Sequence, residues 1–294
     1  MKKLSSIDSF KEGDTVQGFY LCVDKHLRHT RSGDLYIDLE LRDITGHIAA
    51  KIWDNVSDLS EKFEAGNAVV VSGNVESFMD RPQLVVKKIN KATVQHYSRY
   101  GFDPAHVVPT SKKDPQKMWK EIESIVNGMK NKYLQRLVAA IYKSNKKKLM
   151  VHPASVKMHH NFRSGFLEHF LHDIGKLKEI NSEYEADYTN DGNLIGHIVI
   201  GRDMVRDAIK KIRNFPEDLG QKMEHIILSH QGRYEWQSPK MPSFPEAMLV
   251  HLIDVLDAKM NLMNIALDED QELGEFTNRH NYFRIPLLKK DGSK

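Results

Sequence analysis

The sequence lacks any apolar stretch long enough to cross a membrane, which takes about 20 predominantly apolar residues. It has one cysteine, Cys22, which excludes an intrachain disulfide framework. No apolar run follows the charged first residues, and we therefore expect no signal peptide. Such cysteine usage is typical of a reducing compartment, so we expect a cytoplasmic protein with no membrane partner, in which Cys22 is a small buried apolar residue.

The charge of the chain is unevenly distributed. The formal net charge of the 294 residues is only +3, yet residues 111–150 contain eleven Lys and Arg against three Asp and Glu. A concentrated positive potential attracts polyanions, so this segment is a candidate guide for a nucleic-acid backbone. The alternative is that Lys146, Lys147 and Lys148 form an ordinary solvated helix end.

Residues 15–90 predict a small β domain. Residues 35–42 and 47–53 alternate between apolar and polar side chains, which is typical of strands with one buried face. We expect further strands at 15–23, 67–75 and 83–89 and a short helix at 55–64. Five strands with a helix between the third and the fourth is the order of an OB-fold, a barrel that often binds single strands.

Side chains on the outer face of this barrel suit nucleic acid. Tyr36, Lys51 and Trp53 are predicted to point away from the core. An aromatic ring stacks on any base, at about 1–3 kcal/mol per base, and a nearby cation follows the phosphates. We expect a polar loop from Asp24 to add three basic candidates, Lys25, Arg28 and Arg31. The alternative is that Trp53 packs beneath a loop and the basic residues are only solvated.

The rest of the chain predicts helices. Asp114 and Pro115 are a favourable start for a helix, because Asp can cap the first turn and Pro is tolerated within it. We expect helices at 114–127, 132–144, 201–213, 216–229 and 244–267.

A His-Asp pair, His172 and Asp173, is the clearest chemical motif. His169 precedes it, so the three residues stand at i, i+3 and i+4 and would share one face of a helix. Imidazole and carboxylate together suit a divalent metal such as Mn²⁺, Fe²⁺ or Zn²⁺. Further candidate ligands follow along the chain at His197, His230 and Asp254.

This ordered set resembles the HD-domain metal-dependent phosphohydrolases. The surrounding phrases, at 159–169, 171–176 and 255–260, are similar to those of the YhaM-type 3′-5′ exoribonucleases, whose members carry an OB-fold before the HD domain. The resemblance implies a multidomain α and β chain. Its expected parts are a five-stranded OB-fold β-barrel at 1–95, a basic helical connector at 96–148 and an all-α HD domain at 149–294.

The resemblance also implies a function. The chain would be a metal-dependent 3′-5′ exoribonuclease that hydrolyses single-stranded RNA to nucleoside 5′-monophosphates, with single-stranded DNA as a further substrate and a homo-oligomer left open. It would hold two divalent ions, which we expect to be Mn²⁺. The implied ligands are His169, His172, Asp173 and Asp254 for one ion, and His197 and His230 for the other, with Asp173 as the bridge and catalytic carboxylate. Lys176 would be catalytic by donating to a phosphate oxygen, and His160 and Arg163 would contact substrate.

One departure from the family pattern leaves alternatives open. In the family a further helix separates the phrases that contain His169 and His172, whereas here only Phe170 and Leu171 do. Either the chain has lost this helix or a segment is missing from the sequence, and the intact flanking phrases favour the second. With a true loss, the chain would bind single strands without cutting them. A phosphohydrolase of small nucleotides is the other alternative, although a small ligand needs no track of excess positive charge.

Overall fold

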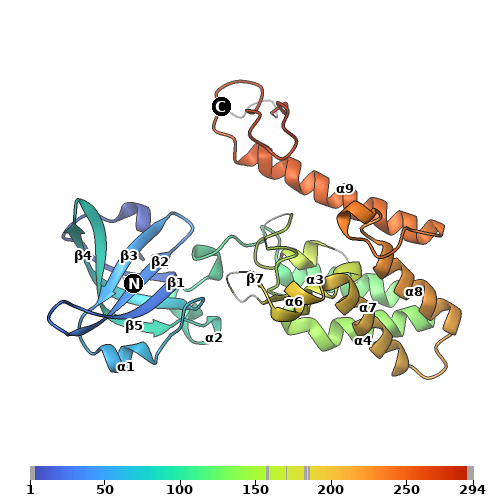
Figure 1. Cartoon of the computed structure of the whole chain (residues 1–294), viewed down its shortest axis with the longest axis horizontal. Coiled ribbons are helices and arrows are strands. Elements are labelled where there is room, and N and C mark those ends of the chain that lie inside the picture. The colour runs from blue at the N-terminus through green and yellow to red at the C-terminus, as the bar shows by residue number, and fades with distance from the viewer. Residues whose placement is uncertain (1–3, 157–158, 170, 182–183, 185, 290–294) are drawn as a thin grey trace. The chain divides into compact units, whose positions relative to one another are not determined.

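The computed structural model describes residues 4–289 apart from 157–158, 170, 182–183 and 185 (Figure 1). The described chain divides into two compact units. The first contains the residues up to Thr110 together with Tyr184, and the second contains the other described residues from Ser111 onward. The segment expected as a connector, 96–148, is therefore shared between the two units. Each unit has a hydrophobic core of its own.

The first unit contains a closed five-stranded barrel. Its strands are β1 (Thr15–His29), β2 (Leu35–Arg42), β3 (His47–Ile52), β4 (Ala68–Phe78) and β5 (Arg81–Lys91). They follow the order β1-β2-β3-β5-β4, in which only β3 and β5 pair in parallel. Helix α1 (Val56–Ser60) lies between β3 and β4 in the sequence, so the predicted OB-fold is confirmed. A further short helix, α2 (Val94–Tyr97), follows the barrel.

The alternation in the sequence correctly predicts most of the barrel core. The inward residues of β2 and β3 are buried, namely Ile37, Leu39, Leu41, Ile48, Ala50 and Ile52. Cys22 is also buried, as expected. The predicted end of the first strand was wrong. An irregularity between Cys22 and Asp24 lets β1 continue to pair with β2 as far as His29, so Lys25 and Arg28 lie in a strand and not in a loop.

The second unit is mainly helical and contains two paired two-residue strands, β6 (Ile180–Asn181) and β7 (Asp187–Tyr188). Its helices are α3 (Pro115–Gly128), α4 (Lys132–Leu149), α5 (Lys176–Glu179), α6 (Asn190–Leu194), α7 (His197–Lys210), α8 (Glu217–Ser229) and α9 (Pro245–Asp268). The Asp114 side chain caps α3 by accepting a hydrogen bond from the backbone N–H of Gln116, as its position predicted. Lys146, Lys147 and Lys148 lie in the last turn of α4. This helix ends at Leu149, five residues beyond its expected end at 144.

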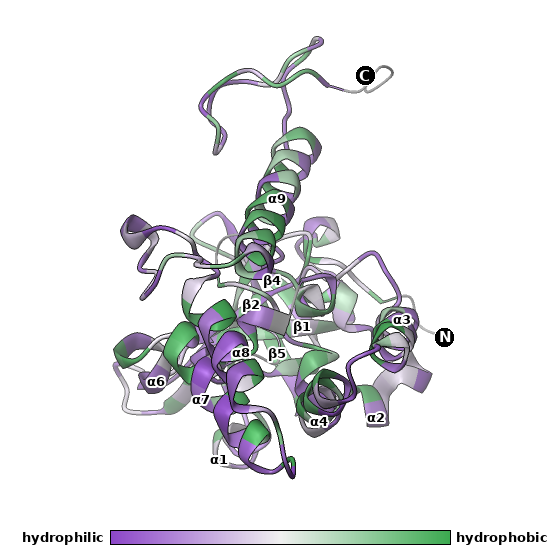
Figure 2. Cartoon of the chain, turned by 90° about the vertical axis from the view of Figure 1, so that its right-hand side faces the viewer, coloured by the Kyte–Doolittle hydropathy of each residue, from purple (hydrophilic) through white to green (hydrophobic). Residues whose placement is uncertain are grey.

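The core of the second unit packs mainly between α3, α4, α7 and α8. It includes Met118, Trp119, Leu137, Ile141, Val205 and Ile227. Helix α9 is less well covered, and Figure 2 shows hydrophobic residues along it. Its exposed apolar side chains are Met248, Leu249, Leu252, Leu256 and Met260. None of the helices that the structure describes is long and apolar enough to span a membrane.

Candidate metal centre

The first three predicted ligands lie on two short turns. His169 follows the 3₁₀ turn η4 (Gly165–Glu168) with extended backbone, at φ −104° and ψ 178°. His172 and Asp173 belong to a second 3₁₀ turn, η5 (Leu171–Asp173). The expectation that the three residues share one face of a helix was therefore wrong.

At two glycines, the backbone of these turns closely approaches two different segments of the chain. A Cβ on Gly165 would lie 2.3 Å from the carbonyl oxygen of His160, and a Cβ on Gly175 would lie 1.9 Å from that of His197. Only glycine permits such an approach. The turn before His169 thus packs on the loop at His160, and the chain after Asp173 packs on α7, which explains why no single helix runs through both.

Three longer helices supply the remaining predicted ligands. His197 is the first residue of α7, and His230 follows the last residue of α8. Asp254 lies in the middle of α9, and both it and His230 are buried. The ligands thus come from distant parts of the sequence to one place in the second unit.

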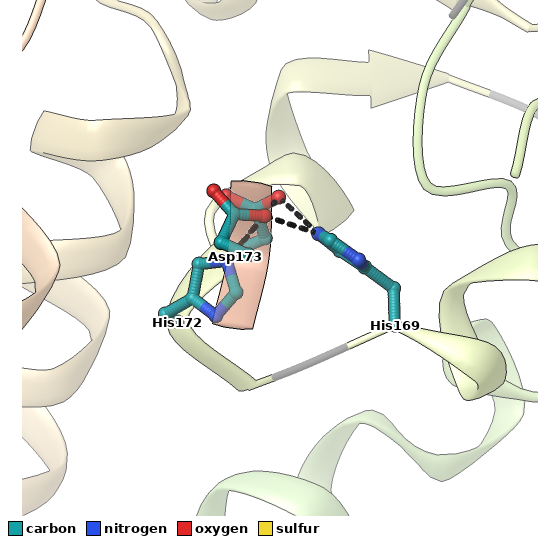
Figure 3. A group of neighbouring side chains, drawn as sticks. His169, His172 and Asp173 are labelled. Carbon is teal, nitrogen blue, oxygen red and sulfur yellow. Dashed lines mark hydrogen bonds and ion pairs between the residues drawn. The ribbon is translucent and has the colours of Figure 1, made fainter. Parts of the chain in front are cut away.

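Four of these residues form the first group. Nε2 of His169 lies 2.9 Å from Oδ2 of Asp173 and 3.4 Å from Oδ1 of Asp254. Nε2 of His172 lies 3.2 Å from the same oxygen of Asp254. Figure 3 shows the His169 ring pointing toward the Asp173 carboxylate. One donor atom from each of the four residues falls within 4.8 Å of the others, which is close enough for one ion to contact all of them.

The other carboxylate oxygen of Asp173 completes a second group. Its Oδ1 lies 3.3 Å from Nε2 of His197 and 3.0 Å from Nε2 of His230. The donor atoms of these three residues also lie within 4.8 Å of one another. Asp173 therefore turns one oxygen toward each group, as a carboxylate that serves two cations would.

The donor atoms of the centre fit a divalent cation. Oδ1 of Asp173 and Nε2 of His197 are buried and face each other at 3.3 Å, but neither makes a hydrogen bond of good geometry within the described structure. A buried polar atom without a partner costs about 1–3 kcal/mol, and a bound cation would provide the missing contact. Imidazole and carboxylate ligands together suit a first-row divalent metal. The buried cluster thus fits a divalent metal site.

Positive groups surround the Asp173 carboxylate. Burial raises its pKa, but the Lys176 ammonium, which contacts Oδ2, and the neighbouring imidazoles outweigh burial and hold the pKa well below its usual range. Burial lowers the pKa of His169, whereas hydrogen bonds to Asp173 and Asp257 outweigh this effect and raise the pKa to about 9. The carboxylates are therefore ionised at neutral pH, which metal coordination requires.

Two ligand imidazoles are held through their second ring nitrogen. Nδ1 of His230 donates to the backbone carbonyl of Ile227 at 2.7 Å. Nδ1 of His197 lies 3.0 Å from Oε1 of Glu179, which also accepts the backbone N–H of His197 at 3.0 Å. Such contacts fix the orientation of an imidazole and leave its other nitrogen for a metal. Glu179 was not identified from the sequence, because no motif marks it and only the fold brings it to the start of α7.

The two residues predicted to contact substrate near this centre differ in exposure. His160 is buried, and its Nε2 lies 3.0 Å from Oδ2 of Asp257. Arg163 is partly exposed, and its backbone carbonyl accepts a hydrogen bond from Ser111.

The first unit carries an aromatic cluster with a cation at its centre. The rings of Tyr36 and Trp53 stack with centroids 4.7 Å apart. Nζ of Lys51 lies 4.9 Å from the Tyr36 ring centroid, 5.6 Å from that of Trp53 and 5.8 Å from that of Phe78. Trp53 and Phe78 are 43% and 53% exposed. The predicted outward placement of Tyr36, Lys51 and Trp53 is confirmed, and Phe78, at the end of β4, is a member that the sequence did not indicate.

The three predicted basic candidates are placed differently. The Lys25 ammonium donates to the carbonyls of Ser60 and Phe63, and its side chain is only 9% exposed, so it connects β1 to the α1 segment. Arg28 pairs with Asp38 at 3.1 Å. Arg31 lies in the turn between β1 and β2 and is exposed.

Comparisons with known proteins agree with both units. The HD domain family matches residues 169–259, and an OB-fold nucleic acid binding domain family matches residues 23–92. The 3′-5′ exoribonuclease YhaM of Oceanobacillus iheyensis is 31% identical over an alignment 300 positions long, which covers 91% of this chain and 91% of that protein. The chain belongs to the YhaM family of 3′-5′ exoribonucleases. The match to this YhaM relative is longer than the 294 residues of the chain, so the relative contains residues that this chain lacks.

Solved structures also align with part of this YhaM family member. One is the second OB-fold domain of replication protein A from Methanococcus maripaludis, at 19% identity and a TM-score of 0.26 over 30% of this chain and 94% of that one. Another is a mitochondrial single-stranded DNA binding protein from S. cerevisiae, at 12% identity and a TM-score of 0.25 over 28% of this chain and 97% of that one.

Proposed function

We propose that the chain is a metal-dependent 3′-5′ exoribonuclease that hydrolyses single-stranded RNA to nucleoside 5′-monophosphates. The observation that carries this proposal is the position of Asp173, which turns one oxygen toward each of two buried groups of ligands. Two cations so placed, Mn²⁺ in our proposal, would activate a water and neutralise charge on the phosphoryl oxygens. Membership in the YhaM family supports the direction of degradation and RNA as the substrate.

The residues of the centre would have different roles in metal binding and catalysis. His169, His172, Asp173 and Asp254 would hold one ion, and Asp173, His197 and His230 the other. Lys176 is buried beside Asp173, where its ammonium would donate to a non-bridging phosphate oxygen. His160 and Arg163 remain proposed contacts of the substrate.

The OB-fold would hold the single strand. The cluster of Tyr36, Lys51, Trp53 and Phe78 combines exposed aromatic faces with a cation, which are the features that bind bases and phosphates without strong sequence preference. The exposed Arg31 would add a phosphate contact, with Arg28 beside it. Single-stranded DNA would also bind here, because stacking does not require the 2′-hydroxyl group. We propose a cytoplasmic location and leave the homo-oligomer to measurement.

Degradation of end-labelled RNA tests the proposed activity directly. A single strand labelled at its 5′ end should shorten from the 3′ end and release nucleoside 5′-monophosphates. A chelator should stop the reaction because it removes the ions, and Mn²⁺ should restore it because the same ligands can bind the ions again. The same RNA with a stable 3′-terminal hairpin is the control and should resist. Turnover of mononucleotides without decay of the strand would instead indicate a hydrolase of small nucleotides, and binding without decay a silent binding protein.

Removal of the largest ring of the aromatic cluster should weaken RNA binding. For Trp53→Ala we expect the Kd for a single-stranded oligonucleotide to rise roughly 5- to 150-fold, which corresponds to the loss of about 1–3 kcal/mol of stacking. The measurement is fluorescence anisotropy without added metal, so that the strand stays intact. Tyr100→Ala is a matched control, since Tyr100 is an exposed aromatic residue of the same unit with Arg99 beside its ring. Equal affinities of Trp53→Ala and the unaltered protein would contradict the assignment of this face.

A further inference from the structure

Asp257 is a partly buried carboxylate outside the proposed ligand set. Its Oδ2 lies 2.9 Å from Nδ1 of His169, the imidazole whose Nε2 faces Asp173 and Asp254. His169 is therefore held between Asp257 on one side and the proposed metal ligands on the other. Lys259, the neighbouring cation on α9, contacts Tyr282 at 3.0 Å and does not share this arrangement.

The hydrogen bonds around Asp257 determine which nitrogen of each ring carries a proton. The backbone N–H of His160 donates to Oδ1 of Asn261 at 3.0 Å, which orients the amide and turns its NH₂ group toward Nδ1 of His160 at 3.5 Å. Because an amide nitrogen only donates, Nδ1 of His160 accepts and its Nε2 carries the proton that is donated to Asp257.

The same reasoning extends to His169. An ionised carboxylate only accepts hydrogen bonds, so Nδ1 of His169 must carry a proton and donate it to Asp257. Nε2 of His169 faces Oδ2 of Asp173 at 2.9 Å and shares a proton with it in the metal-free chain. A cation bound between Asp173 and Asp254 would displace that proton and leave Nε2 with the lone pair that a ligand needs, while Nδ1 keeps its bond to Asp257. In metal sites, a carboxylate in this position fixes the tautomer and orientation of the ring and increases its basicity as a ligand.

The backbone positions the residues of this hydrogen-bond network, both on α9 and at His160. Asp254, Asp257 and Asn261 stand at i, i+3 and i+7 on α9 and therefore lie on one face of the helix. Asp254 is a proposed metal ligand, Asp257 contacts the ligand His169, and the Asn261 amide contacts His160. His160 itself has a φ of +49°, a left-handed conformation that a residue with a side chain rarely adopts. Strain of this kind is kept only where the surroundings require it.

We propose that Asp257 is a positioning residue of the metal centre, which holds His169 with Nε2 toward the cation and is itself held by His160 and Asn261. This inference rests on the proposed metal site. It gives Asp257 the role of supporting the ligand His169 and not that of contacting substrate. It also gives His160 a role in supporting Asp257.

Metal affinity measured without RNA tests the assignment. The full chain is freed of metal and titrated with Mn²⁺ by calorimetry, as the unaltered protein and as Asp257→Asn and Asp257→Ala. We expect the Kd for Mn²⁺ to rise about 10- to 100-fold, with Ala more severe than Asn, because Asn keeps an acceptor but loses the charge. At saturating Mn²⁺ the KM for RNA should stay unchanged. Asp268→Asn, an exposed carboxylate of the same helix, is the control and should bind Mn²⁺ normally.

Two results would overturn the proposal. The first is an Mn²⁺ affinity of Asp257→Asn equal to that of the unaltered protein, and the second is an unchanged affinity with a raised KM for RNA, which would make Asp257 a substrate contact. If Asp257→Ala does not fold, Asn261→Ala keeps the carboxylate but removes its anchor, and a several-fold loss of Mn²⁺ affinity is expected. The titration contains no RNA, so an unaltered protein that binds Mn²⁺ but degrades no RNA would refute the proposed function alone.

Discussion

Asp173→Asn should lower the metal-dependent degradation of single-stranded RNA by about 10³-fold or more. The carboxylate contacts both ligand groups through different oxygens, and the asparagine amide presents only one oxygen and no charge. Metal ions contribute several kcal/mol to transition-state stabilisation, and about 4 kcal/mol corresponds to a factor of 10³. The measurement is the initial rate of decay of an end-labelled strand at fixed Mn²⁺.

The control for this variant must separate lost chemistry from lost folding. Asp173→Asn leaves the buried Lys176 ammonium without its anion, and an unpaired buried charge is destabilising. The double variant with Lys176→Met removes that charge and should recover the unfolding midpoint while its activity stays lost. Asp207→Asn, an exposed carboxylate on α7, should leave both quantities unchanged. Normal RNA decay by Asp173→Asn would refute the role of Asp173 and, with it, the proposed two-group centre.

The sequence predicts the barrel well where one face of each strand is buried. The strict alternation in β2 and β3 fixes which side chains point inward, and this pattern depends only on local geometry. The end of β1 could not be predicted in the same way. Residues 24–29 are mostly polar, and their strand exists because β2 continues alongside them, which is a long-range contact.

The proposed ligands could be identified from the sequence, but their supporting residues could not. His172 and Asp173 are adjacent and match a family motif, whereas Glu179 and Asp257 become informative only when the fold brings each to the second nitrogen of an imidazole. A carboxylate without a motif is far more often a surface residue. Phe78 was missed for the same reason, since its link to Lys51 crosses between strands that are distant in the sequence.

The metal centre and the core beside it differ in how closely they are packed. The turns of the centre pack against the loop at His160 and against α7. Beside His172, however, lies an apolar pocket of about 240 Å³. It is lined by Leu137, Ile141, Val205, Met223, Ile226, Ile227, Val250 and Ile253.

Gly175→Ala should disable the centre through the backbone. The added Cβ would lie 1.9 Å from the carbonyl oxygen of His197 and 2.6 Å from the backbone N of Gly201, so no side-chain rotation relieves the clash. We expect a loss of about 3 kcal/mol or more in the free energy of unfolding, since overpacking against backbone is at the severe end of such changes. Activity should fall about 100-fold in the protein that remains folded, because the chain beside Asp173 must move away from α7 and displacements near 1 Å have effects of that size.

A graded series of glycine variants shows whether this close approach is the cause. Gly201→Ala meets the backbone N of Gly175 at 3.2 Å and should be milder, while Gly128→Ala meets no atom within 4 Å and should be neutral. Chemical denaturation and the Mn²⁺-dependent decay rate are measured for all three variants. If Gly175→Ala has the same stability and the same decay rate as Gly128→Ala, then α7 does not fix the position of Asp173. The order Gly175, Gly201, Gly128 in both measurements would instead show that the distance between these two backbones sets the geometry of the centre.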